Sequence, residues 1–167
     1  REIPYYQTKN SWPLLRGLLK RANQIVLLLS IFLPLASILF VSMFLVNLSS
    51  EKYYTLCIAA IVVPIMAQTR MNSFILRGLR HVIMAQLHTA LHPGAFVIFI
   101  GIVCLILHIK LLPHQAMGLH LLAAIVTFFF ILMATTRVKP MKIKQVDPEY
   151  ETRRWLRSSL PFMFTSY

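Results

Sequence analysis

The stretch "IVLLLSIFLPLASILFVSMFLV", from Ile25 to Val46, decides the fold class of this chain. It has 22 residues and no charge, and about 20 apolar residues are enough for a helix to cross the hydrocarbon core of a bilayer. The strands of a membrane barrel would instead alternate apolar and polar residues. The stretch therefore predicts a transmembrane helix, with a kink at Pro34 near its middle.

Three further apolar stretches predict spans of the same kind. The second expected span covers about residues 53–70, with tyrosines at one end and an arginine at the other as interface anchors. The third covers about residues 91–112 and should open at Pro93, since proline suits the first turn of a helix. The fourth covers about residues 116–136, and only "LLPHQ" separates it from the third. The third and fourth spans should therefore form an antiparallel hairpin.

Composition supports a membrane protein and not a water-soluble one. Hydrophobic residues make up 57% of the chain and charged residues 13%, whereas soluble proteins have about 25% charged residues. A fifth span is expected to start at Leu160, where the sequence turns apolar again. We therefore expect residues 1–167 to form one transmembrane helical domain of an all-α polytopic membrane protein, with basic connecting helices.

The distribution of charge predicts the topology. The net charge is +12, a value that also occurs in nucleic-acid-binding proteins. Fifteen of the lysines and arginines lie in residues 1–24, 70–90 and 137–157, which the four spans place on one side, whereas only Lys52 and Lys110 lie opposite. By the positive-inside rule the three basic segments are cytoplasmic. Because the charge lies in loops that flank a membrane, no nucleic acid is needed to explain it.

Residues 70–92 form the most patterned segment and predict one amphipathic helix with a cationic stripe. Two interpretations stay open. The cations fix the topology and touch lipid phosphates, or Arg77 and Arg80, helped by Arg70 and Gln86, draw an anionic headgroup into a cytoplasm-facing cavity. Guanidinium groups suit the second task because their donor fork matches phosphate oxygens.

Leu-Arg-Gly-Leu occurs twice, in "PLLRGLLKRA" (Pro13 to Ala22) and in "FILRGLRHVI" (Phe74 to Ile83), with Arg16 and Arg77 at matching positions. Each copy precedes a span that runs outward, so each is expected to hold the start of a helix at the anionic leaflet. We expect the first copy to anchor the chain and the second, at Arg77 and Arg80, to be the place where an anionic headgroup would bind.

The spans contain none of the residue patterns expected of an enzyme. The acidic residues all lie in the predicted loops, namely Glu2, Glu51, Asp147, Glu149 and Glu151. No phosphate-binding glycine loop, nucleophile elbow or zinc-protease motif occurs in the sequence. The expectation is a protein without enzymatic activity and without a cofactor.

Six histidines raise the question of a metal site. His88 and His92 are four residues apart and can share a helical face, but no nearby cysteine or acid completes a ligand set. The other histidines near the third and fourth spans are expected at the interface, namely His108, His114 and His120. We therefore expect no metal site, and we expect Cys57 and Cys104 to be packing residues.

Several motifs resemble those of the bacterial polysaccharide (oligosaccharide-lipid) flippases, members of the multidrug/oligosaccharidyl-lipid/polysaccharide exporter superfamily. Leu76 to Val82, then Gln86-Leu87, then Pro93 resemble the stretch around the fourth and fifth helices of that family. Residues 11–30 ("SWPLLRGLLKRANQIVLLLS") resemble the approach to its third helix, and residues 153–164 ("RRWLRSSLPFMF") the approach to its seventh. The family often has proline and arginine where this chain has His88 and His92.

The resemblance implies helices three to six, and the beginning of seven, of a two-lobed transporter in the bacterial inner membrane. Such a transporter moves an undecaprenyl-pyrophosphate-linked oligosaccharide by alternating access for surface polysaccharide assembly. Its partners would be the bilayer, the anionic lipid-linked oligosaccharide and the remaining helices of the parent transporter. Because the sequence starts at Arg1 and not at methionine, we expect a piece of a longer protein. Two alternatives stay open: a small membrane scaffold or subunit, and a drug or metal exporter of the same superfamily.

Overall fold

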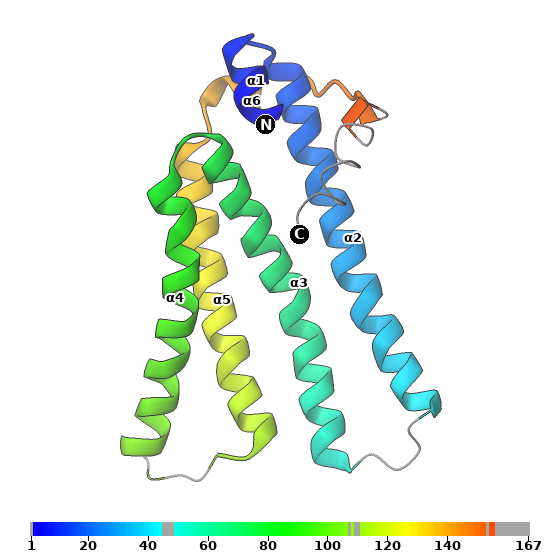
Figure 1. The fold of residues 1–167 in the computed structure, drawn as a ribbon, viewed down its shortest axis with the longest axis vertical. Coiled ribbons are helices and arrows are strands. Elements are labelled where there is room, and N and C mark those ends of the chain that lie inside the picture. Colours follow the sequence, from blue (N-terminus) through cyan, green and yellow to red (C-terminus); the bar gives the residue numbers. More distant parts are fainter. Residues whose placement is uncertain (1, 45–48, 107, 109–110, 153, 156–167) are drawn as a thin grey trace, which may run out of the picture.

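The computed structural model describes residues 2–44, 49–106, 108, 111–152 and 154–155, and within these ranges the chain is helical, with no strand (Figure 1). The helices in order are α1 (Glu2–Thr8), α2 (Trp12–Phe44), α3 (Ser50–Gly78), α4 (Val82–Gly101), η1 (Ile102–Ile106), α5 (Pro113–Val138) and α6 (Met141–Gln145). Four helices are long and apolar enough to cross a membrane: α2, α3, α4 with its continuation η1, and α5. The predicted fold class, an all-α polytopic membrane protein, is confirmed.

The predicted start of the third span is wrong. Helix α4 begins at Val82, and Pro93 lies inside it and not at its first turn. A proline inside a helix removes one backbone hydrogen bond, and membrane helices tolerate this loss where neighbouring helices pack against them. Beyond Gly101 the helix continues as the π-helical turn η1.

The predicted continuous helix over residues 70–92 is also wrong. Helix α3 ends at Gly78, and the chain turns before α4 begins. The turn is a Schellman motif: the Arg80 N–H donates to the Arg77 carbonyl (3.1 Å), and the His81 N–H donates to the Leu76 carbonyl (2.9 Å). The predicted cationic stripe is therefore divided between the end of one helix and the start of the next.

Helix α3 lies at the centre of the bundle. It packs against α2, α4 and α5, and α5 also packs against α4 (Figure 1). The predicted hairpin of the third and fourth spans is thereby confirmed. The predicted fifth span, from Leu160, lies outside the described residues. The described residues of the three basic segments gather at one end of the bundle, with α1, α6 and the turn between α3 and α4 (Figure 1). We call this the basic end.

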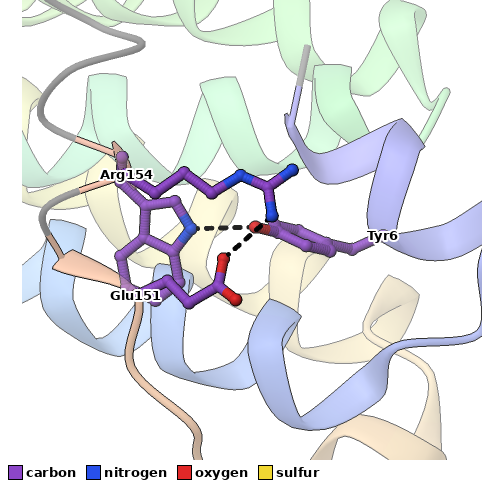
Figure 2. A network of polar contacts seen from close by, with 4 residues as sticks. Tyr6, Glu151 and Arg154 are labelled. Atoms are coloured by element: carbon purple, nitrogen blue, oxygen red, sulfur yellow. Dashed lines mark hydrogen bonds and ion pairs between the residues drawn. The ribbon is translucent and has the colours of Figure 1, made fainter.

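A hydrophobic cluster joins the N-terminal and C-terminal segments at the basic end. Its buried members come from α1, α2, the end of α3 and α6, and are Tyr6, Leu15, Leu19, Ile75, Leu79 and Ile143. The Trp155 indole N–H donates to the Tyr6 hydroxyl (3.0 Å), and both side chains are buried (Figure 2). A nearby ion pair between Arg154 and Glu151 (3.1 Å) is exposed, so it adds little stability.

In both Leu-Arg-Gly-Leu copies the glycine lies against another segment of the chain, next to residues of this cluster. A Cβ atom at Gly17 would overlap the carbonyl oxygen of Glu149, and the Glu149 N–H donates to the Pro13 carbonyl (3.1 Å). A Cβ atom at Gly78 would lie 2.7 Å from a side-chain carbon of Ile3. Each glycine therefore leaves room for another segment to cross its helix. The repeated motif therefore has two explanations: each copy precedes a span, and each glycine is needed for close packing.

Candidate functional site

The arginines singled out by the sequence are exposed at the basic end. Arg70 and Arg77 lie seven residues apart on α3, hence on nearly the same face, and Arg80 lies in the turn that follows. The Arg77 guanidinium lies 5.8 Å from the centre of the Phe74 ring. None of the three makes an ion pair among the described residues. Gln86 is exposed on the second turn of α4. Within the described part of the chain, its side chain makes no hydrogen bond to these arginines.

Arg16, the counterpart of Arg77 in the first Leu-Arg-Gly-Leu copy, has a different environment. Its guanidinium donates to the carbonyl of Val146, in the segment that follows α6. The guanidinium therefore tethers a distant part of the chain to α2. In both copies the glycine packs against another segment of the chain. Only in the second copy is the arginine, Arg77, exposed and without a hydrogen bond to a distant carbonyl in the described structure.

Arg80 adopts a backbone conformation that L-residues avoid. Its φ angle is 67°, in the left-handed region where the Schellman position usually carries glycine. For a residue with a Cβ atom this region costs roughly 1–2 kcal/mol. Residues kept in such conformations cluster at functional sites, so the strain gives a reason to examine the Arg80 side chain for a role.

Arg80→Gly is expected to raise the free energy of unfolding by roughly 1 kcal/mol, because glycine adopts the left-handed conformation without steric cost. Thermal unfolding of the purified chain measures the change. Arg70→Gly is the matched control, because it also replaces an exposed arginine by glycine, but inside helix α3. Glycine is unfavourable inside a helix, so this variant should lower the free energy of unfolding by about 1 kcal/mol. A loss of stability in both variants would show that the Arg80 side chain itself stabilises the turn.

A second group of polar side chains lies among the helices of the bundle, apart from the exposed arginines. Helix α3 buries four polar side chains that share one face of the helix: Gln68, Thr69, Asn72 and Ser73. The Thr69 hydroxyl donates to the Ile65 carbonyl (2.8 Å), and the Asn72 amide donates to the Gln68 carbonyl (2.9 Å). The Gln68 side-chain nitrogen is buried without a partner in the described structure. Buried polar groups in spans are costly and typically functional.

His88 connects this polar face of α3 to α4. Its Nδ1 lies 2.9 Å from the Ser73 hydroxyl and 2.8 Å from the Ala85 carbonyl oxygen. Since a carbonyl oxygen can only accept, we assign the proton of neutral His88 to Nδ1. The basic nitrogen of His88 is then Nε2.

His92 and His120 meet between α4 and α5. Their ring centres are 4.7 Å apart with the planes at 88°, and the centre of the Phe96 ring lies 5.1 Å from that of the His120 ring. Packing of α5 against α4 brings the His120 ring into the contact between the two helices, and its expected position at the membrane interface stays a prediction. No group of three or more metal-ligating side chains occurs in the described part of the chain.

The sequence contained part of the signal for this second group. The spacing of Gln68, Thr69, Asn72 and Ser73 places them on one helical face, and His88 and His92 share a face of α4. Pairing of His92 with His120 had no local signal, because the two residues lie on different helices.

No family model, curated protein or solved structure matches this chain. Its class therefore rests on the structure: four apolar helices of spanning length define an all-α polytopic membrane protein.

Proposed function

We propose that this chain is part of a non-enzymatic transporter of the oligosaccharide-lipid flippase type. On this proposal the basic end faces the cytoplasm of a bacterium, and the substrate is an undecaprenyl-pyrophosphate-linked oligosaccharide in the inner membrane. The observation that carries the proposal is the exposed arginine pair at the turn between α3 and α4, where Arg80 occupies a strained position.

The chemistry of that turn suits a pyrophosphate. Arg77 and Arg80 follow one another closely, since the Arg80 N–H donates to the Arg77 carbonyl (3.1 Å). Two guanidinium groups offer paired donors to the oxygens of a phosphate, and hydrogen bonds between charged partners are the strong ones. Arg70, two turns earlier on α3, adds positive charge on the same side of the helix. A multiply charged headgroup would be recruited there before it crosses.

The scaffold alternative draws on α2. Its apolar side chains are widely exposed, for example Leu28, Phe32 and Met43. Such a face suits lipid or the remaining helices of a larger assembly equally well. A pure scaffold, however, gives no reason for an arginine at a glycine-type position, and the transporter proposal does.

Replacing Arg77 and Arg80 together by glutamine is expected to weaken binding of undecaprenyl pyrophosphate at least tenfold. Charge-assisted hydrogen bonds contribute about 1.5–3 kcal/mol each, and 1.4 kcal/mol corresponds to tenfold in affinity. The measurement is lipid binding to the purified chain in nanodiscs of neutral phosphatidylcholine, titrated with undecaprenyl pyrophosphate.

The matched control is the double variant Lys20→Gln and Arg21→Gln, which removes two exposed cations of the basic end on α2. It should retain the affinity of the unmodified chain. Equal losses in the two double variants would mean that the basic end attracts anions only through its overall charge. Unchanged affinity in both would return Arg77 and Arg80 to a role in topology alone.

A further inference from the structure

The contact between His92 and His120 lies inside two spans. His92 is the eleventh residue of α4 and His120 the eighth of α5. At 1.5 Å per residue they lie about 15 Å and about 10 Å from the starts of their helices. Their rings meet edge to face, and the Phe96 ring meets the His120 ring edge to face as well. Two ionisable groups are thus held together at a depth where ionisable groups are rare.

One nitrogen of this pair is buried without a partner. The Nε2 atom of His92 has no hydrogen-bond partner within the described structure and is shielded from solvent. A neutral imidazole has one donor and one acceptor nitrogen. An unsatisfied buried polar atom requires an explanation, and a nitrogen that takes up and releases a proton supplies one.

We propose that His92 and His120 form a proton-binding site between α4 and α5. The pair holds one proton in preference to two, because the second charge would be placed directly against the first. The site therefore has two states, neutral and singly protonated. The charged state requires water or a new hydrogen-bond partner, so protonation weakens the apolar contact between the two helices at this level.

The surroundings of the pair set its capacity at one proton. The titratable groups that act on His92 are His120 and, one turn earlier on α4, His88. Helices α4 and α5 carry no acidic residue that could neutralise a second charge. The polar face of α3 contacts α4 through the uncharged Ser73 hydroxyl, which lies 2.9 Å from His88 Nδ1. The charged residues of the packed helices are all exposed, including the acid of α3, and are Glu51, Lys52, Arg70, Arg77 and Arg137.

This inference goes beyond the proposed function, since it supplies a site for an ion that a transporter exchanges or is regulated by. It depends on a different group of residues from the arginine pair. The Arg77 and Arg80 double variant should keep the titration of His92 and His120 unchanged. Failure of one proposal in its own test therefore leaves the other proposal standing.

The test is a histidine titration by NMR. The chain is labelled with ¹³C and ¹⁵N histidine in nanodiscs and followed from pH 4 to pH 9. We expect the His92 and His120 signals to change together, in two steps separated by more than one pH unit, as coupled sites do. His81, exposed in the turn after α3, is the internal control, because it lies outside the pair.

His120→Phe tests the coupling directly. Phenylalanine keeps a ring beside Phe96, and His92 should then titrate in a single step. If this variant does not fold, the two-step titration of the unmodified chain still decides. Independent single-step titration of His92 and of His120 would overturn the proposal. Absence of any titration of the pair between pH 4 and pH 9 would overturn it as well.

Discussion

Gly17→Ala is expected to detach the segment after α6 from the basic end. The added methyl group would occupy the position of the Glu149 carbonyl oxygen, and a backbone atom cannot move aside as a flexible side chain can. The crossing segment would leave α2 and would give up the hydrogen bond from Glu149 to Pro13. It would also withdraw Trp155 from its buried contact with Tyr6. Truncation of a buried tryptophan to alanine costs about 3–5 kcal/mol, which is an upper bound for the loss of this contact.

Fluorescence of Trp155 measures this detachment. The chain has two tryptophans, so Trp12→Phe makes Trp155 the only indole, and its emission should shift to the red when Gly17 becomes alanine. Gly94→Ala and Gly118→Ala are matched controls, because a Cβ atom at either position meets nothing within 4 Å. Unchanged Trp155 emission in the Gly17→Ala chain would contradict the described crossing.

Leu76→Ala is expected to lower the free energy of unfolding by about 2–5 kcal/mol, the usual range for truncating a buried leucine. The Leu76 side chain is 0% exposed and packs with Ala85 and Ile131, so it joins α3, α4 and α5. Its carbonyl also accepts the His81 N–H (2.9 Å), and the backbone bond survives the substitution. The loss therefore reports side-chain packing beneath the turn.

Denaturant-induced unfolding in detergent micelles measures this loss. Leu28→Ala is the control: the same substitution on α2 affects a side chain that is 68% exposed. Its effect should be within about 0.5 kcal/mol, as for surface positions. Similar losses for the two variants would place Leu76 outside the contact between the three helices.

The spans and the common side of the basic segments were predictable because both depend on properties that add along the chain. A window of about 20 residues is apolar or not whatever lies beside it, and the excess of cations can be counted loop by loop. The ends of the helices were less accessible. Pro93 looked like a start and lies inside α4. The turn after Gly78 carries Arg80, not glycine, at its left-handed position, so the usual signal of a helix end was absent.

The candidate site was predictable only in part, for a related reason. Arg77 and Arg80 drew attention by their type and spacing, and the structure shows them exposed. Arg16 has the same local sequence but donates to Val146, 130 positions away. No local pattern distinguishes the two arginines, because the difference depends on which segment crosses each helix.

By itself, the sequence determined that this chain is a bundle of membrane-spanning helices with its positive charge at one end. Hydropathy and charge act residue by residue, so these features need no knowledge of neighbours. The tertiary structure alone decided that the two Leu-Arg-Gly-Leu glycines lie beneath crossing segments and that His92 meets His120. Those contacts depend on which helices are adjacent and in which register they pack, and close packing of the whole bundle sets both.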